Sequence, residues 1–348
     1  MTDYLIVGSG LAGIAFAETA LQHNKTIFVI DADVCNSSKV AAGLYNPVVL
    51  KRFTALAHAE VHLDQLDVFY GAIEAKLNFK FNFKLPVLRK FASAEEQNDW
   101  FAASDKPGLT PFLSTELVHQ NYCGIEAPFG YGKVNRTGFV NTTMLVEKYK
   151  AWLFQKELLL TEIFDYIQLE SHSNFLKYKK ITARHIIFAE GFGMHANPFF
   201  KNLPLDGAKG ELLIIKAPGL TLDVALNASV FILPLGDDMF KIGATYNWTD
   251  KTEIPTDTAK QELVERLKEV LTCDYEIVAH YAGVRPTVKD RKPLIGTHSE
   301  YPAVHIINGL GTRGVILAPA MAKTLFERIE NGTSLPPEID ISRFHKIK

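Results

Sequence analysis

The sequence has little of what marks secreted, membrane-spanning or polyanion-binding proteins. Three cysteines, Cys35, Cys123 and Cys273, stand in neither a metal-ligand nor a CxxC spacing, so we expect free thiols. No uncharged apolar run approaches the ~18 to 20 residues of a membrane span, and the first residues lack the basic region of a signal peptide. A net charge of -2 gives no basic surplus to hold nucleic acid. We expect a cytoplasmic protein without a membrane partner.

A glycine-rich motif organises the first 32 residues. A strand-like run precedes Gly8-Ser9-Gly10-Leu11-Ala12-Gly13, and a helix-like stretch and a second strand-like run follow it. In such a unit Gly8 allows the tight turn, Gly10 lets the backbone approach a pyrophosphate, and Gly13 lets the helix lie close to the strand. Asp31 stands 18 residues beyond Gly13, near the roughly 20 expected for a carboxylate that binds ribose hydroxyls. The motif predicts an adenine dinucleotide and leaves NAD and FAD open.

The end of the chain repeats this pattern. A strand-like run over 303–308 leads into the turn Gly309 to Gly314, and helix-like residues continue over 315–329. A chain whose two ends form the same unit can close one sheet from both ends. An NAD domain is usually one contiguous block, so this arrangement favours FAD.

The middle of the chain divides into two kinds of sequence. Some stretches carry short alternating strands and turns, and one helix there is capped by Thr256 or Asp257. Others carry long helices, over 54–77 and from Thr142 to about 157 with Asn141 as its cap. Strand pieces follow over 162–170 and 175–179, and then a buried strand over 181–191. We therefore expect an α/β fold with a Rossmann-like FAD-binding domain split into residues 1–78, 141–208 and 285–348, and an inserted substrate domain, an antiparallel β-sheet plus helix, made of residues 79–140 and 209–284.

Seven motifs in order resemble the D-amino-acid oxidase and glycine oxidase superfamily of FAD-dependent amine oxidoreductases. They are the opening DYLIVGSGLAGIAFA, Ala42-Gly43-Leu44, Phe188-Ala-Glu-Gly191, Ile242-Gly-Ala-Thr245, Ala282-Gly-Val-Arg285-Pro286, Asp290-Arg-Lys-Pro293-Leu-Ile-Gly296 and Gly309-Leu-Gly-Thr-Arg-Gly314. The segment AAGLYNPVVLKRFTALAHAEVHLDQLDVFY also resembles the flavin domain of the bifunctional enzyme that modifies wobble uridine in tRNA. Tyr281 and Tyr246 stand where many superfamily members carry a Trp and an acid.

The resemblance implies which residues contact FAD. Gly43 is expected near the isoalloxazine and Gly191 near the adenosine, while N–H groups of the last glycine turn would face the flavin pyrimidine edge. The full predicted set is Gly8, Ser9, Gly10, Leu11, Ala12, Gly13, Asp31, Ala32, Ala42, Gly43, Leu44, Ala189, Gly191, Gly309, Leu310, Gly311, Thr312, Arg313 and Gly314.

Arginine is the side chain expected at the substrate, because its guanidinium offers two parallel N–H donors to a carboxylate. The resemblance implies this role for Arg285, with an ion pair to Asp290 or to another acid as the alternative. Arg313 is either a second clamp or a support for its turn. Tyr246, Tyr281 and Arg52 are further candidates for the pocket, with core packing or a solvated surface as the alternatives.

The predicted function is FAD-dependent oxidation of the C–N bond of a small amino acid or secondary amine. Hydride passes to flavin N5, the imine hydrolyses, and molecular oxygen or another acceptor reoxidises the flavin. One alternative is a tRNA-modifying flavoenzyme acting on a carboxymethylaminomethyl uridine, which needs a basic patch around Lys39, Lys51 and Arg52. The other is a flavin-binding protein without turnover. No metal site is predicted, because His58 and His62 lack a third ligand.

Overall fold

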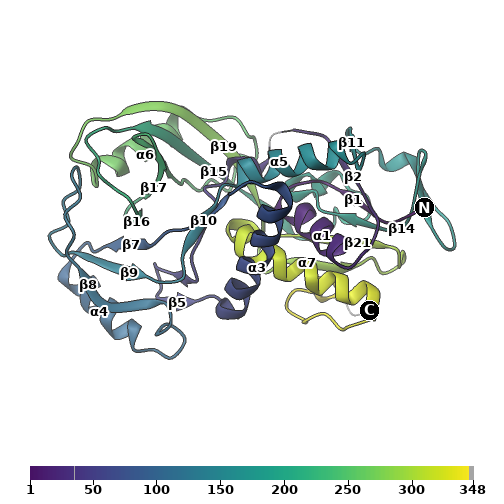
Figure 1. Ribbon diagram of the computed structural model, residues 1–348, viewed down its shortest axis with the longest axis horizontal. Helices are drawn as coiled ribbons and strands as arrows, with labels where there is room; N and C mark the ends of the chain where they lie inside the picture. Colours follow the sequence, from purple (N-terminus) through teal and green to yellow (C-terminus); the bar gives the residue numbers. More distant parts are fainter. Residues whose placement is uncertain (35, 345–348) are drawn as a thin grey trace.

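The computed structural model describes residues 1–34 and 36–344, which build two large sheets side by side (Figure 1). The first sheet has eight strands, and its core pairs β1 with β2 and β14 in parallel, and β14 with β21. Its strands are β11 (Leu159–Thr161), β2 (Ile27–Asp31), β1 (Thr2–Val7), β14 (Ile181–Phe188), β13 (Leu176–Tyr178), β12 (Leu169–Ser171), β21 (Val304–Asn308) and β20 (Leu294–Thr297). Apolar runs with few polar residues suit these central strands, which are covered on both faces.

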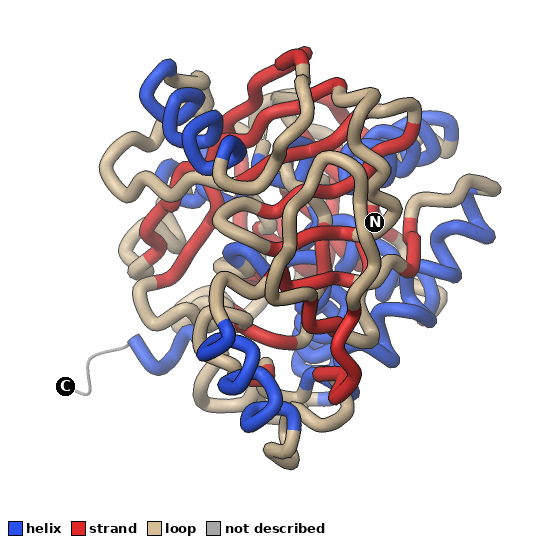
Figure 2. The backbone as a smooth tube through the Cα atoms, turned by 90° about the vertical axis from the view of Figure 1, so that its left-hand side faces the viewer, coloured by secondary structure: helices blue, strands red, loops and turns tan. Residues whose placement is uncertain are grey.

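The second sheet also has eight strands and is mostly antiparallel. In order they are β19 (Glu276–Val288), β15 (Leu205–Lys216), β18 (Met239–Gly243), β17 (Phe231–Gly236), β16 (Ala225–Asn227), β7 (Val87–Lys90), β9 (Tyr131–Val134) and β8 (Leu113–Val118). Smaller sheets pair β3 (Leu44–Tyr45) and β6 (Asn82–Lys84) with β10 (Gly138–Val140), and β4 (Val48–Val49) with β5 (Thr54–Ala55). Figure 2 shows the strands in the middle of the molecule and helices around them.

Seven α-helices of the described residues cover the sheets. They are α1 (Leu11–Gln22), α2 (Ser37–Val40), α3 (Ala59–Leu77), α4 (Ala94–Ser104), α5 (Thr142–Gln155), α6 (Asp257–Lys268) and α7 (Gly314–Asn331), with 3-10 turns η1 (Tyr166–Gln168), η2 (Gly191–Ala196), η3 (Gly311–Arg313) and η4 (Ile341–Phe344). The first and last long helices, α1 and α7, pack against each other beside the first sheet (Figure 1). Within the described ranges, no helix combines the length and apolarity needed to cross a membrane.

The α/β class is confirmed, and so are two predicted helix caps. Asn141 Oδ1 accepts a hydrogen bond from the Met144 N–H at 3.2 Å, and Thr256 Oγ1 accepts one from the Ala259 N–H at 3.3 Å. Thr256 is therefore the cap of α6. The strands β15 and β19 cross the expected boundaries at 208/209 and 284/285, since each runs unbroken past them.

Two predicted elements differ from the structure. The helix expected over 54–77 begins only at Ala59, because His58 takes a left-handed conformation with φ of 54° and Thr54–Ala55 pair with β4 instead. The strand expected over 162–170 is wrong except at residues 169–170, which belong to β12; η1 precedes them, where the Asp165 side chain accepts from the Ile167 N–H and starts a turn. In both places a local backbone turn overrides the apolar spacing.

Candidate cofactor and substrate site

A single cavity of about 740 Å³ extends between the two sheets. The first sheet contributes the turn after β1 and the end of β2, and the second contributes β15, β19 and the segment after β18. Fifteen of the predicted cofactor residues line it: Gly8, Gly10, Leu11, Ala12, Asp31, Ala32, Ala42, Gly43, Leu44, Ala189, Gly191, Leu310, Gly311, Thr312 and Gly314. The remaining four, Ser9, Gly13, Gly309 and Arg313, are not among the lining residues.

The first glycine turn can form only with glycines at two positions. Gly8 has a φ of +98°, and a Cβ at Gly13 would lie 1.9 Å from the Gly8 carbonyl oxygen. Helix α1 begins at Leu11, and its N-cap Gly10 has no side chain to accept from the first turn. The Leu11 N–H donates to Ser38 Oγ at 3.1 Å, and Gly10, Leu11 and Ala12 line the cavity. A helix N-terminus beside a close-packed glycine turn fits a pyrophosphate.

Asp31 is already engaged on both carboxylate oxygens. Its Oδ2 accepts from Ser9 N at 2.6 Å and Ser9 Oγ at 2.9 Å, while Oδ1 accepts from Asp33 N at 2.8 Å and from Lys150 Nζ. Burial opposes ionisation, but the hydrogen bonds from Lys150 and Ser9 outweigh it, so the pKa of Asp31 is below its usual value. A ribose hydroxyl would share these oxygens with Lys150, a residue that the motif did not indicate.

The wall beyond Asp31 is apolar and includes one partly buried carboxyl group. Val34 and Ile163 line the cavity although 57% and 77% of their surfaces are exposed, which suits contact with a flat ring such as adenine. Glu190 also lines it, and its carboxylate accepts from Asn197 Nδ2 at 2.7 Å and from the Tyr166 hydroxyl. Burial raises the pKa of Glu190 to about 7. Glu190 lies inside the Phe188–Gly191 motif, which did not indicate its side-chain partners, and Tyr166 carries no sequence signal for this position.

The loop at 41–44 forms another part of the wall. Gly43 has a φ of +74°, and a Cβ there would lie 1.8 Å from the Val140 carbonyl oxygen. The preceding Ala41 carbonyl accepts from Lys241 Nζ at 3.2 Å, and burial lowers the pKa of Lys241 to about 8. A lysine from the second sheet thus holds the loop expected at the flavin.

Arg285 is held flat between a glycine and an aromatic ring. A Cβ on Gly210 would lie 2.0 Å from Arg285 Nη2, so only glycine leaves room for the guanidinium on strand β15. The centre of the Tyr246 ring lies 4.5 Å from Arg285 Cζ. Nη1 of Arg285 donates a hydrogen bond to the Thr245 carbonyl at 3.3 Å. No carboxylate of the described residues forms an ion pair with Arg285, whose pKa is lowered by burial. Its other N–H groups are available to a ligand in the cavity.

The alternative ion pair with Asp290 is not formed, because Asp290 pairs with Arg343 at 3.0 Å. Of the other predicted substrate residues, Tyr246 lines the cavity, whereas Arg313, Tyr281 and Arg52 do not. Arg313 Nη2 donates to the Arg291 carbonyl at 2.6 Å, which favours a support for the turn. Tyr281 is 49% exposed, and Arg52 is exposed in the turn between β4 and β5; neither lines the cavity.

The remaining predictions concern metal and thiols. His58 and His62 have ring centres 6.2 Å apart, and within residues 1–34 and 36–344 no group of three His, Cys, Asp or Glu side chains could hold a metal ion. Cys123 and Cys273 are free, and Cys35 lies outside the described residues.

An α/β fold with this glycine turn, a helix N-terminus facing the cavity and an acid at the end of β2 defines a protein that binds an adenine dinucleotide. The family model for FAD dependent oxidoreductases matches residues 3–328. The chain therefore belongs to the family of FAD-dependent oxidoreductases, which confirms the predicted enzyme class and cofactor.

Individual proteins are similar to this chain over most or part of its length. The chain is 24% identical over 362 residues to the glycine oxidase of Bacillus subtilis (strain 168), covering 94% of this chain and 93% of that protein. The crystal structure of glycine oxidase from Bacillus cereus ATCC 14579 superposes with a TM-score of 0.77 at 17% identity, over 96% of both chains. The bifunctional tRNA 5-methylaminomethyl-2-thiouridine biosynthesis protein MnmC of Aromatoleum aromaticum (strain EbN1) is 25% identical over 44% of this chain and 28% of its own length.

Proposed function

We propose that this protein oxidises the C–N bond of a small amino acid or secondary amine, with FAD in the cavity and the substrate carboxylate on Arg285. The observation that carries the proposal is the Arg285 guanidinium, which lines the cavity without a carboxylate partner among the described residues. The similarity to glycine oxidases supports an amino acid as substrate. The lack of a carboxylate partner for Arg285 in the described part of the chain also argues against a flavin-binding protein without turnover, because in that case we would expect Arg285 to form a buried ion pair.

The division of labour follows from the two sides of the cavity. Residues of the parts 1–78, 141–208 and 285–348 would hold FAD through the glycine turns and Asp31. Residues of the parts 79–140 and 209–284, together with Arg285, would bind and orient the amine. Bound FAD supplies the electron acceptor for the carbon next to nitrogen. The protein fixes that carbon at the flavin by holding the carboxylate, which reduces the entropic cost of reaction.

The proposal is tested by anaerobic reduction of the flavin. The purified protein should show an oxidised flavin spectrum, and at least one of glycine, sarcosine, D-alanine, L-proline and D-proline should bleach it. Arg285→Leu should retain FAD and raise the KM for the active substrate by tenfold or more, because the two charge-assisted hydrogen bonds are lost. Arg266→Leu, on the exposed face of α6, is the matched control. Unchanged kinetics in Arg285→Leu would refute the role.

The second candidate is oxidation of a carboxymethylaminomethyl group on tRNA, which the similarity to MnmC favours. Lys51 and Arg52 are exposed together, as that function needs, while Lys39 pairs with Asp33 at 3.0 Å. Bleaching by tRNA that carries this group, with no response to free amino acids, would select the second candidate.

A further inference from the structure

The segment 245–256, here called the site loop, follows β18 and forms the wall next to Arg285. It supplies the Thr245 carbonyl that accepts from Arg285 and the Tyr246 ring that stacks on it. Further along the loop, Lys251 and Glu253 also line the cavity. The placement of Arg285 therefore depends on the placement of this loop.

The first part of the site loop is paired with the backbone of β15. Lys209 N donates to the Asn247 carbonyl at 2.8 Å, and Asn247 N donates back to the Lys209 carbonyl at 2.9 Å. Next to them, Glu211 N donates to Thr245 Oγ1 at 3.0 Å. These contacts pair the backbone around residues 245–247 with β15, but none of them holds the Tyr246 side chain or residues 248–256.

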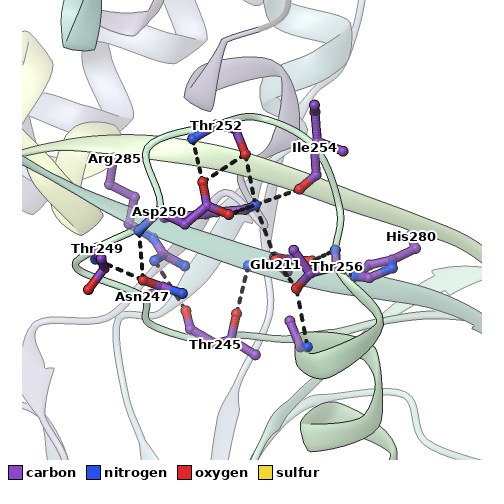
Figure 3. A network of polar contacts seen from close by, with 12 residues as sticks. Glu211, Thr245, Asn247, Thr249, Asp250, Thr252, Ile254, Thr256, His280 and Arg285 are labelled. Atoms are coloured by element: carbon purple, nitrogen blue, oxygen red, sulfur yellow. Dashed lines mark hydrogen bonds and ion pairs between the residues drawn. The ribbon is translucent and has the colours of Figure 1, made fainter.

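Two sets of contacts hold the second part. Lys251 Nζ donates to Asp206 Oδ1 at 2.8 Å and to the Gly207 carbonyl, both on β15. The other contacts come from two ionisable side chains that have almost no exposed surface, Lys209 at 0% and Glu211 at 2%. Lys209 Nζ lies 2.6 Å from Asp250 Oδ2 and 3.3 Å from Thr252 Oγ1, and it also donates to the Ile254 carbonyl. In Figure 3 Asp250, Thr252 and Ile254 surround this contact. Hydrogen bonds from Lys209 hold the pKa of Asp250 down at about 2. One buried cation thus ties down three positions of the loop.

Glu211 anchors the far end of the loop. Its Oε2 accepts from Thr256 N at 2.7 Å and its Oε1 from Thr256 Oγ1 at 2.9 Å, at the residue that caps α6 (Figure 3). Glu211 Oε1 lies 3.5 Å from Lys209 Nζ, and Oε2 lies 2.9 Å from His280 Nε2. A buried pair with so many partners keeps one arrangement, because moving any partner leaves a charge without compensation.

Three consecutive residues of β15, Lys209 to Glu211, both hold the site loop and leave room for Arg285. Side chains alternate between the faces of a strand, so Lys209 and Glu211 point away from the face on which Gly210 lies under Arg285. We propose that Lys209 is a positioning residue: by holding Asp250 it keeps the site loop against the cavity, and the loop keeps Tyr246 on Arg285, ready for the substrate carboxylate. This inference rests on the proposed carboxylate role of Arg285.

Asp250→Asn is the sharpest test, because it leaves the buried Lys209 and Glu211 pair in place. Asp250 accepts from Lys209 on Oδ2 and from Thr252 N on Oδ1, so either orientation of an Asn amide places a donor against a donor. Lys209→Met is the second variant. Asp67→Asn on α3 is the matched control, because it alters an exposed ion pair with Lys84 of β6.

The FAD-loaded proteins are compared by hydrogen exchange of the 245–256 amides and by titration with acetate and benzoate, followed through the flavin absorbance. In Asp250→Asn the amides of Thr252 and Thr256 should exchange at least tenfold faster, and the Kd for the carboxylate should rise at least fivefold. The Kd for FAD should stay within twofold, and Asp67→Asn should match the original protein. KM for the amine should rise more than kcat falls.

Two results would overturn the inference: site-loop exchange unchanged in Asp250→Asn, or faster exchange with unchanged carboxylate binding. If Lys209→Met does not fold, Asp250→Asn alone decides. Failure of the proposed function looks different, because the original protein itself would then bind neither acetate nor benzoate, and the role assigned to Lys209 would fall with it.

Discussion

Gly210 and Arg285 stand on neighbouring strands, and the missing side chain of the first is the space that the second occupies. Atoms Nη1, Nη2 and Cζ of Arg285 all lie within 2.2 Å of where a Gly210 Cβ would be. No other residue fits there without displacing the guanidinium. The geometry of carboxylate binding can therefore be disturbed without touching the arginine.

Gly210→Ala should push the guanidinium off the strand while leaving its charge in the cavity. We expect the KM for the amine substrate to rise by tenfold or more and the Kd for FAD to change less than twofold, as measured by steady-state kinetics and flavin fluorescence. Gly71→Ala is the control, because a Cβ on Gly71 meets nothing within 4 Å. Equal kinetics for the two variants would contradict the placement of Arg285.

Tyr246 should act on Arg285 through its ring and not through its hydroxyl. A cation over an aromatic ring gains about 0.5 to 2 kcal/mol, so Tyr246→Ala should weaken substrate binding roughly 2- to 30-fold. Tyr246→Phe keeps the ring 4.5 Å from Arg285 Cζ and should stay within twofold of the original protein. Initial rates over a range of substrate concentrations separate the two variants. A Phe variant as weak as the Ala variant would assign the effect to the hydroxyl.

Glu190 should make the protein less stable as the pH rises from about 4.5 to about 7. Its pKa is about 7 in the folded chain and about 4.5 when unfolded, so over this range the unfolded state loses a proton that the folded state keeps. The free energy of unfolding then falls by up to about 3 kcal/mol, at ~1.4 kcal/mol for each unit of pKa. Urea unfolding of the original protein and Glu190→Gln at several pH values measures the difference between them. A difference that does not vary with pH would contradict the raised pKa.

Lys241 should have the opposite pH dependence. Its pKa falls to about 8 on folding from an ordinary value near 10.5, so the folded state gives up its proton first as the pH rises. The original protein should gain stability relative to Lys241→Met between about pH 8 and about pH 10.5. Thermal unfolding of both proteins at pH 7, 9 and 10 tests this. Parallel pH profiles would show that Lys241 titrates normally.

Many of the predicted cofactor residues could be found from their spacing in the sequence. The turn from Gly8 to Gly13 and the acid Asp31 lie within one strand, turn, helix, strand unit, so their spacing alone predicts that they lie close together. Lys150 binds the same Asp31 from 119 residues away, and no local pattern indicates that contact. Glu190 lies inside a motif, but the sequence does not indicate its hydrogen-bond partners Asn197 and Tyr166, which only the fold brings close.

The surroundings of Arg285 were less predictable, because they also depend on contacts between distant parts of the chain. Arg285 was found through a motif, but the groups that orient it come from β15 and from the site loop, about 40 to 75 residues earlier in the chain. Lys209 looks in the sequence like any solvent-facing lysine, and only strand pairing shows that it is fully buried. Pairing between distant strands depends on the whole sheet, which a single sequence does not specify locally.

The pairing of β14 with both β1 and β21 has a consequence for biosynthesis. A ribosome releases the first glycine turn near the start of translation and the last one only after about three hundred residues have been made. Until β21 and α7 emerge, the cavity lacks the part of its wall that Leu310, Gly311, Thr312 and Gly314 form. With FAD in this cavity, as proposed, uptake of the cofactor should follow synthesis of α7, and shortage of the vitamin precursor should leave a protein with an open cavity.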